Sequence, residues 1–485
     1  MRCLLDDYID RLLKYLIKTK TRILVHAENN EMIKEKDILV KNHEKSRPAL
    51  KEVTNMIKAL TNVNIFNYDS LKKDSYVLFD KQIIEVGSME NFKGANEVYD
   101  CNRCILMPGL VNAHSHIYST FARGWITEFD PKSFIDLLQQ MWWKLDKVLG
   151  EKEIYYSGLV SGIEFIKNGV TTVIDHHASG TKIKGSLDLL KQALCDELGI
   201  RGVFCFESSE RFPIDKCIEE NIEFSKNNSN MSAGLFGMHA CLTLSDDSLK
   251  KIASKSKGMP IHIHVGESDE DNIKSLEKYN KTPIERLEEH GLLRDNSILS
   301  HCIYLSEKDM DILSKHNVYV ALNPTSNFNN AVGLADVLEL EKRNIKCLLG
   351  NDGLGFNLSR EMINLVFGMH LKYESPTAYS LDKLKKIIEN NYKYASEILG
   401  CKLGKIEKGY EADFLTLDYK APTPINEDNL FGHYFYGMLD NFKPKDVWCN
   451  GEIKLKDYKI LQDEEKIFEE STKVAEEIWK KCKEK

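Results

Sequence analysis

Short apolar runs alternate with helical stretches from about Met107 onward, and this pattern constrains the fold more than any other feature of the chain. The helical stretches, such as YYSGLVSGIEFIKNG and TPIERLEEHGLL, carry apolar residues at helical spacing. Apolar strands joined by helices indicate βαβ units around a buried parallel sheet. Eight such repeats predict an α/β fold of the (β/α)8 TIM-barrel type. The eight runs are GLVNAHSH, TTVIDHH, GVFCFES, GLFGMHA, PIHIHVGE, SILSHC, VYVALNP and KCLLGND.

Short β-rich runs flank the predicted barrel on both sides. KALTNVNIFNY, SYVLFD and QIIEVGS precede it, and GKIEKGYEADFLTLDY and DVWCNGEIKLKDYKIL follow it. We expect these flanking segments to meet in a small β-sandwich domain. The predicted organisation is a helical N-terminal extension over 1–55, the first part of the β-sandwich over 56–106, the barrel over 107–400, the second part of the β-sandwich over 401–460, and a C-terminal helix over 461–485.

Composition argues against several classes of protein. A formal net charge of -8 disfavours a nucleic-acid binder, and no apolar stretch is long enough to span a bilayer. Asp6, Asp7 and Asp10 interrupt the N-terminal apolar segment, so no signal peptide is expected. The same aspartates disfavour a helix that lies on a membrane surface, although that alternative stays open. The 12 scattered cysteines, with Cys101 and Cys104 as ordinary strand-end residues, predict reduced thiols and a cytoplasmic location.

Histidines gather at one end of the predicted barrel. Of the 14 histidines, eight lie at or beside the C-terminal ends of the apolar runs. Barrels of this type build their active sites at that end of the strands. One histidine at a strand end is more often structural, but eight together indicate a site. The eight are His114, His116, His176, His177, His239, His262, His264 and His301.

Four of the strand-end residues form a candidate metal site. His114 and His116 are two residues apart, so both imidazoles can face the barrel axis at the end of strand one. His264, which shares a strand face with His262, ends strand five, and Asp352 follows strand eight. Imidazole and carboxylate are ligands for zinc and iron, and a catalytic site needs about three protein ligands and an open position for water. His114, His116, His264 and Asp352 therefore predict a site for a divalent transition metal.

Acid–base groups accompany these ligands. Water on such a metal can have a pKa of ~7. Asp352 can contact the metal and take the proton of that water, and Glu267 can pass the proton to a leaving group as a general acid. His301, at the end of strand six, can polarise the water or hold a developing oxyanion. The predicted catalytic residues are thus Glu267, His301 and Asp352.

These motifs resemble those of the amidohydrolase superfamily. MPGLVNAHSH is similar to its strand-one signature, and HIHVGE, SHCIYL, NPTSN and NDG resemble its strand-five to strand-eight signatures in order. GYEADFLTLD resembles the segment that re-enters the β-sandwich of these enzymes. The resemblance runs from about Met56 to the end of the chain. It is strongest for the deaminase and chlorohydrolase branch, and WWKLDKVLGEKEIYYSGL, VIDHHAS and YKAPTPINEDNLFGH are most similar to SsnA-type aminohydrolases.

The resemblance implies which residues hold the metal. His114 and His116 match the first metal ligands, His264 matches the third and Asp352 the last. Relatives with two metals carry a bridging lysine at the end of strand four, and here that strand ends in FGMHACL without a lysine. We therefore expect one ion, with zinc favoured over iron. Asn351 departs from the usual Thr or Ser, which affects only the hydrogen bonds around the last ligand.

The resemblance also implies roles in proton transfer and substrate binding. Glu267 and His301 match the proton-shuttling pair, and His239 matches a position that often contacts substrate in this branch. His177 and Glu207 are further candidates for the pocket.

Two arginines and one more histidine are ambiguous on sequence alone. His176 and Arg211 are also candidates for the pocket, although Arg211 could instead form a surface ion pair with Glu207. Arg123 could bind an acidic substrate group, but an anchoring role for the loop after strand one is favoured.

The predicted function is a metal-dependent aminohydrolase, or deaminase, that releases ammonia from an amidine-like carbon of a purine, pyrimidine or related small molecule. A chlorohydrolase or amidase using the same water is the alternative. A non-catalytic scaffold is disfavoured because every candidate ligand is present. We expect a small-molecule substrate, no nucleic-acid or membrane partner, and an assembly compatible with a homodimer.

Overall fold

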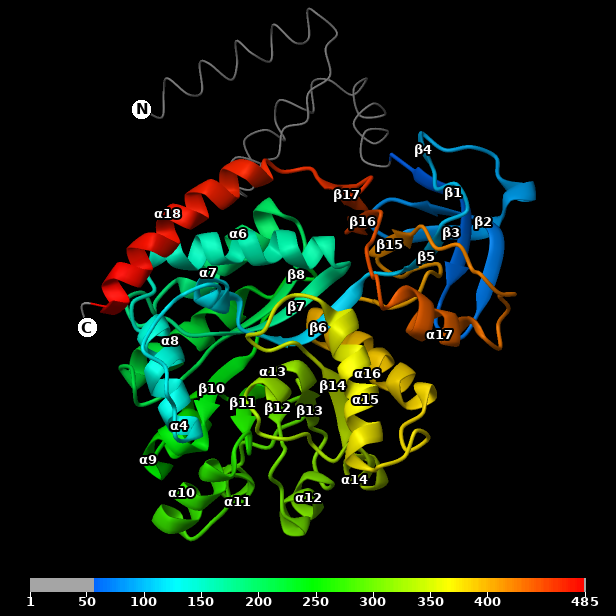
Figure 1. The fold of residues 1–485 in the computed structure, drawn as a ribbon. Helices are drawn as coiled ribbons and strands as arrows, with labels where there is room; N and C mark the ends of the chain where they lie inside the picture. Colours follow the sequence, from blue (N-terminus) through cyan, green and yellow to red (C-terminus); the bar gives the residue numbers. More distant parts are fainter. Residues whose placement is uncertain (1–55, 484–485) are drawn as a thin grey trace, which may run out of the picture. The chain divides into compact units, whose positions relative to one another are not determined.

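The eight apolar runs form parallel strands in the computed structural model, which describes residues 56–483 (Figure 1). The predicted helical extension over 1–55 lies outside the described residues. Except for Lys346, every residue of these strands is buried, because other structure covers both of their faces. One parallel sheet contains β6 (Leu110–Ser115), β7 (Val170–His177), β8 (Arg201–Phe206) and β9 (Ser232–Gly234), and the other contains β10 (Phe236–Ala240), β11 (Ile261–Val265), β12 (Ile298–His301), β13 (Tyr319–Leu322) and β14 (Lys346–Leu349).

The two parallel sheets meet through single bridges at both edges. Ser115, the last residue of β6, pairs with Asp352 in the turn after β14. Ser208, just after β8, pairs with Met238 of β10. The fourth apolar run is divided because Leu235 separates β9 from β10. The predicted α/β architecture with parallel strands is therefore confirmed. A continuously hydrogen-bonded, closed barrel stays a prediction.

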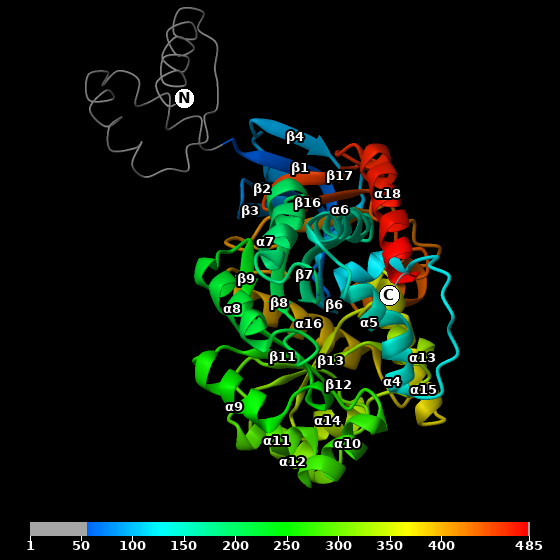
Figure 2. The same ribbon diagram turned by 90° about the vertical axis from the view of Figure 1, so that its left-hand side faces the viewer.

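Helices follow most of the parallel strands and pack outside them (Figure 2). Their starts are encoded locally: Thr282 accepts a hydrogen bond from the Glu285 N–H, the Glu285 carboxylate accepts one from the Thr282 N–H, and Pro283 occupies the first turn of α11. The helices are α6 (Glu151–Lys167), α7 (Ser186–Lys191), α8 (Ile214–Phe224), α9 (Asp246–Lys255), α10 (Asp269–Tyr279), α11 (Pro283–Glu289), α12 (Glu307–Leu313), α13 (Pro324–Asn329), α14 (Val337–Lys342), α15 (Leu358–Lys372) and α16 (Leu381–Leu399).

Short helical turns replace a long helix between β6 and α6, and the C-terminal helix supports them. Helix α18 (Glu464–Lys483) packs along α6. The Trp479 indole N–H donates to the Phe121 carbonyl at 2.8 Å, and Lys481 forms an ion pair with Glu153 at 2.8 Å. Among residues 56–483, no helix is long and apolar enough to cross a membrane. The turns are η2 (Ile117–Ala122), α4 (Phe134–Leu137), η3 (Leu138–Trp142) and α5 (Trp143–Asp146).

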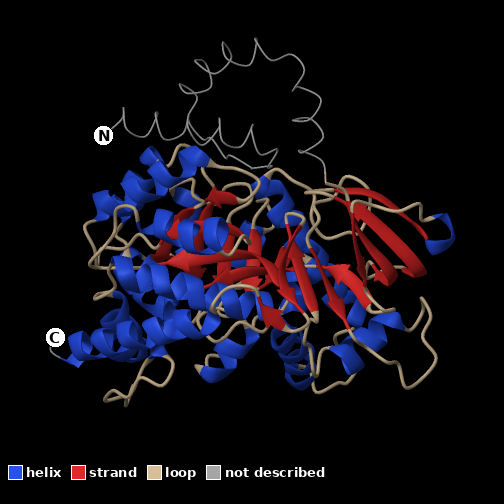
Figure 3. Ribbon diagram, turned by 90° about the horizontal axis from the view of Figure 1, so that it is seen from above, coloured by secondary structure: helices blue, strands red, loops and turns tan. Residues whose placement is uncertain are grey.

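The flanking β-rich segments join in one mixed sheet beside the parallel strands (Figure 3). Strand β5 pairs antiparallel with β15, which unites segments from the two sides of the parallel strands. Phe79 and Phe414 form an edge-to-face pair in its core. Because all nine strands belong to one sheet, a two-layered sandwich stays a prediction. The strands are β1 (Lys58–Phe66), β2 (Leu71–Phe79), β3 (Ile83–Ser88), β4 (Glu97–Asp100), β5 (Ile105–Pro108), β15 (Phe414–Leu417), β16 (Asp446–Cys449), β17 (Glu452–Lys456) and β18 (Lys459–Ile460).

A buried ion cluster ties the mixed sheet to the parallel strands. The guanidinium of Arg201, the first residue of β8, donates to Asp413 at 2.6 Å and to Glu411 at 2.7 Å. All three side chains are almost completely buried. Removing the cation would leave two carboxylates buried without their partner, which costs far more than losing an exposed ion pair.

We predict that Arg201→Leu lowers the free energy of unfolding by about 3 to 5 kcal/mol. Urea denaturation, followed by circular dichroism, measures the change. Lys226→Leu is the control, because the exposed pair of Lys226 with Glu223 should contribute less than about 1 kcal/mol. Equal stability of the two variants would contradict the structural role of the cluster.

Candidate active site

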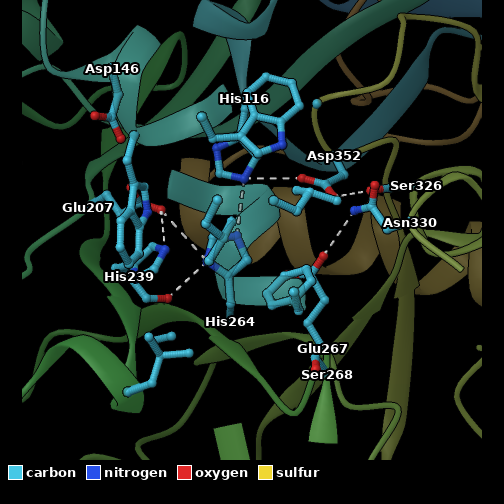
Figure 4. Close-up of a pocket in the computed structure, with 18 of the residues that line it drawn as sticks. His116, Asp146, Glu207, His239, His264, Glu267, Ser268, Ser326, Asn330 and Asp352 are labelled. Atoms are coloured by element: carbon cyan, nitrogen blue, oxygen red, sulfur yellow. Dashed lines mark hydrogen bonds and ion pairs between the residues drawn. The ribbon is translucent and has the colours of Figure 1, made fainter. Parts of the chain in front are cut away.

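Four side chains from three separated segments converge at the C-terminal ends of the parallel strands. Figure 4 shows three of them, His116, His264 and Asp352. The Nε2 atom of His116 lies 3.1 Å from Nε2 of His264 and 3.1 Å from Oδ1 of Asp352. The same carboxylate oxygen is 3.5 Å from Nε2 of His114. One ligand atom from each of these four residues lies within 4.8 Å of the others. The four residues that the sequence assigned to a metal site are therefore brought together.

Backbone pairing explains why Asp352 reaches the histidines. Its N–H donates to the His114 carbonyl at 3.0 Å, and its own carbonyl accepts from the His116 N–H at 3.2 Å. Asp352 adopts a left-handed backbone conformation with φ of 54°, which a residue without a β-branch tolerates best. The Ser326 hydroxyl donates to its Oδ2 at 2.5 Å. The turn after β14 thus holds the carboxylate over the end of β6.

Hydrogen bonds behind two of the imidazoles set their tautomers. Nδ1 of His116 lies 2.7 Å from the His176 carbonyl, and Nδ1 of His264 lies 2.9 Å from the His239 carbonyl. A carbonyl only accepts, so each Nδ1 carries a proton and each neutral ring presents the lone pair of Nε2 to the site.

The third imidazole, His114, leaves its Nε2 atom buried and without a hydrogen bond. On its other side, His114 Nδ1 lies 2.8 Å from Nε2 of His262. His262 is therefore a neighbour of a candidate ligand and lies outside the cluster itself. A buried orphan nitrogen, two further Nε2 atoms and a carboxylate fit the donor set of a divalent transition metal.

The electrostatics of the cluster favour a cation. Burial lowers the pKa of His114 to about 3 and lowers that of His264 well below its ordinary value. Burial would also lower the pKa of His116, but the adjacent Asp352 carboxylate outweighs it and raises this pKa to about 9. Burial would raise the pKa of Asp352, but the adjacent His114 and His116 rings keep it well below its usual range. In the metal-free protein, a proton on His116 balances the buried carboxylate.

A second carboxyl group, that of Glu267, lies beside the cluster, and its pKa is raised where that of Asp352 is lowered. Burial raises the pKa of Glu267 to about 7, His301 opposes this rise, and Asp352 adds to it. Oε2 of Glu267 lies 3.5 Å from Nε2 of His301, and the Asn330 side-chain amide donates to Oε1 at 3.4 Å. Nδ1 of His301 lies 2.8 Å from the Asn327 amide oxygen, which directs Nε2 toward Glu267 and Asp352. Glu267 can therefore exchange a proton near neutral pH.

A pocket opens above the cluster, with a polar floor and an apolar roof. His116, His264, Glu267 and Asp352 line its floor. The turns between β6 and α6 cover it. Their lining side chains, together with one tyrosine after β6, are Tyr118, Phe134, Leu137, Leu138, Trp142 and Trp143.

Glu207 and Arg211 form a largely buried ion pair at the side of the pocket, which excludes the alternative of a surface pair. Arg211 lies 3.3 Å from Oε2 of Glu207 and 2.8 Å from Oδ2 of Asp146, and its guanidinium stacks on Trp143. Burial would raise the pKa of Glu207, but His239, His176 and Arg211 hold it well below its usual range. Burial raises the pKa of Asp146 to about 7, and Arg211 opposes this rise.

The pocket contains two of the three candidate substrate contacts. His239 and Glu207 line it, and Nε2 of His239 lies 3.9 Å from the Glu207 carboxylate. His177 does not line it, and its contact with substrate stays a prediction. Adjacent residues of a strand face opposite sides, and in β7 it is His176 whose ring packs against His264. His177 instead lies 3.1 Å from the Ser179 hydroxyl and packs on Phe206.

The remaining candidates lie around the pocket. His114 and His301 are fully buried beneath it. Arg123 is exposed, stacks over the Phe356 ring at 5.5 Å and does not line the pocket.

Sequence reasoning missed the part of the pocket that lies between β6 and α6. Asp146, Trp142 and Trp143 come from this irregular segment, which no strand-end rule addresses. The sequence signal that could have indicated this part of the pocket is the pair of tryptophans followed by Lys-Leu-Asp, residues 142–146. Asn330 and Ser326 were also missed, although Ser326 belongs to the NPTSN motif that resembles the strand-seven signature.

Comparisons with known proteins agree with this geometry. The amidohydrolase family model matches residues 105–454. A 5'-deoxyadenosine deaminase of Methanococcus maripaludis (strain C6 / ATCC BAA-1332) is 30% identical over 436 residues, which cover 86% of this chain and 97% of the relative.

Two solved structures share the fold at 20% sequence identity. An adenosine deaminase from Xanthomonas campestris with bound zinc has a TM-score of 0.74, over 87% of this chain and 98% of that one. The atrazine chlorohydrolase TrzN from Arthrobacter aurescens TC1, in complex with zinc, has a TM-score of 0.73, over 86% of this chain and 100% of that one. The resemblance seen in the strand-end motifs is confirmed, and the chain belongs to the amidohydrolase family.

Proposed function

We propose that this protein is a metal-dependent aminohydrolase that releases ammonia from an amidine-like ring carbon of a purine, pyrimidine or related small molecule. One observation carries the proposal: three imidazole Nε2 atoms and one carboxylate converge under a pocket, next to a carboxyl group whose pKa is about 7. Metal ligands and a tuned proton carrier at one point are what hydrolysis of such a carbon requires. The name of the Methanococcus maripaludis relative makes adenosine-type compounds the first to test.

We further propose that His114, His116, His264 and Asp352 hold one ion. Zinc is the favoured metal because both structural neighbours contain it, and iron fits the same donor set. Strand β10 ends without a lysine that could bridge a second ion. A bound ion of this kind supplies a Lewis acid and lets water react as a nucleophile near neutral pH.

The protein's own groups would move the protons. Asp352 accepts a proton from the attacking water while Ser326 holds its Oδ2 atom. Glu267, which is partly protonated near neutral pH because its pKa is about 7, donates a proton to the ring or to the departing nitrogen. Nε2 of His301 faces both carboxylates and stabilises charge that develops between them. The aromatic roof excludes bulk water, which strengthens each of these interactions.

A chlorohydrolase is the second candidate, because the TrzN structure shares the fold and the same water could displace chloride. An amidase would use the same site. Release of ammonia or of chloride from matched ring compounds distinguishes these reactions. A scaffold without activity is disfavoured, because it would have no use for the buried, unpartnered Nε2 of His114.

The finer architecture belongs to the same proposal. We infer that the two parallel sheets are the halves of one (β/α)8 barrel and that the mixed sheet acts as the β-sandwich domain. The proposed domain boundaries are 56–106, 107–400, 401–460 and 461–485. The cytoplasmic location and the homodimer stay predictions.

The ligand assignment predicts metal content. Purified protein should hold close to one transition metal per chain. His114→Ala and His264→Ala should each lower that content at least about tenfold, because one of the four converging donors is lost. Elemental analysis by mass spectrometry gives the ratio. His316→Ala, at a partly exposed position near Glu288, is the control. Full retention of metal in both ligand variants would rule out the assignment.

Replacing the proton carrier should separate metal binding from chemistry. Glu267→Gln keeps the size of the side chain and an acceptor for Asn330, so metal content should not change. The variant cannot donate the proton, so kcat for ammonia release should fall by about 10²- to 10⁴-fold. Glu288→Gln, on the surface, should keep full activity. Unchanged turnover in Glu267→Gln would exclude Glu267 from proton transfer.

Metal uptake by the metal-free protein should depend on pH. The pKa of His116 is raised to about 9 beside Asp352, so below that pH a proton must leave before the Nε2 lone pair is free. Apparent affinity for zinc should therefore rise by about tenfold for each pH unit between pH 6 and 8, and binding should release one proton. Competition with a chelator of known pH dependence measures the affinity, and calorimetry in two buffers measures the proton. A zinc affinity that does not change with pH would contradict the raised pKa of His116.

A further inference from the structure

Three carboxylates outside the proposed metal-binding and catalytic residues line the pocket, and we call Asp146, Glu207 and Asp271 the acidic wall. Figure 4 shows Asp146 and Glu207 across the pocket from Glu267 and Asn330. Asp271, near the start of α10, lines the pocket as well. Among the described residues that line the pocket, none is a lysine or an arginine.

The nearest cation, Arg211, is already engaged. It binds Asp146 at 2.8 Å and Glu207 at 3.3 Å, and its guanidinium lies between the Trp143 and Phe212 rings. Turning this side chain toward a ligand would break two buried ion pairs and two stacking contacts. Arg211 therefore holds the wall in place and is not a free receptor for an anion.

Two buried carboxylate oxygens of this wall have no hydrogen-bond donor. Asp146 is 1% exposed and binds Arg211 through Oδ2, which leaves Oδ1 without a partner. Asp271 is 4% exposed and accepts from the Gly266 N–H through Oδ2, which leaves its Oδ1 unpartnered. Buried acceptors of this kind are costly unless a donor reaches them.

We infer that the pocket selects substrates by charge: it accepts a flat ring whose remote substituent is a neutral donor or a cation, and it rejects substituents that carry a phosphate. This inference rests on the proposed function and deepens it. A donor or cation would satisfy the free oxygens of Asp146 and Asp271, and the faces of Trp142 and Trp143 suit both rings and cations. A phosphate would meet the excess negative charge of three carboxylates, two of which share one arginine, and this discriminates strongly against it.

Three adenosine compounds that differ only at the 5' position test the inference. Their binding to zinc-loaded Glu267→Gln protein is measured by calorimetry at pH 8, so the readout does not depend on turnover. We expect 5'-amino-5'-deoxyadenosine to bind at least about tenfold more tightly than adenosine, and adenosine 5'-monophosphate at least about tenfold more weakly.

Variants of the wall locate the effect. Asp146→Asn and Asp271→Asn are each added to the Glu267→Gln protein. Each should reduce the affinity ratio between the amino and phosphate compounds by about tenfold or more, because a carboxylate charge is removed. Adding Asp247→Asn, on the surface of α9, should leave that ratio unchanged.

The inference is overturned if the monophosphate binds as tightly as adenosine, if neither wall variant changes the ratio, or if none of the three compounds binds. Failure of the proposed function looks different: no aminopurine, aminopyrimidine or guanidino compound would release ammonia from the zinc-loaded wild-type protein. Ammonia release together with tight binding of the monophosphate would reject the charge selection alone.

Discussion

The carboxylate of Asp352, buried among imidazoles, is the contact on which the candidate site depends. It lies 3.1 Å from His116 and 3.5 Å from His114, because the turn after β14 pairs with the end of β6 through the backbone. A buried carboxylate needs a compensating positive charge. In the metal-free protein a proton on His116 provides it, and an ion bound to the same donors would take over that role. The position of the carboxylate thus follows from strand pairing, and the demand for a cation follows from its burial.

Two glutamates near this contact are tuned in opposite directions by their surroundings. Glu267 has few partners besides His301 and Asn330, and burial raises its pKa to about 7. Glu207 is more deeply buried but faces His239 and Arg211, and its pKa stays well below the usual range. One carboxyl group is therefore suited to carry a proton, and the other is suited to hold a fixed negative charge. Because both residues are glutamates, the different roles that we propose for Glu267 and Glu207 come from their packing.

The wall of the pocket belongs to a segment that the parallel strands do not position directly. The turns between β6 and α6 supply Trp142, Trp143 and Asp146. Arg211, in the turn after β8, stacks on Trp143 and pairs with Asp146. Helix α18 supports the same segment through Trp479. The reacting groups thus sit on rigid strand ends, and the groups that would distinguish substrates sit on a segment braced by distant parts of the chain.

The sequence by itself determined the order of parallel strands and helices and the gathering of His114, His116, His264 and Asp352, because strand periodicity and the common direction of parallel strands act locally and repeat. Tertiary structure decided the rest. It turned His177 away from the pocket and buried the pair of Glu207 with Arg211. It also recruited Asp146 from an irregular segment and joined the two parallel sheets through single bridges at their edges. Each of these outcomes depends on contacts between segments far apart in the chain, and no local pattern of residue types encodes such contacts.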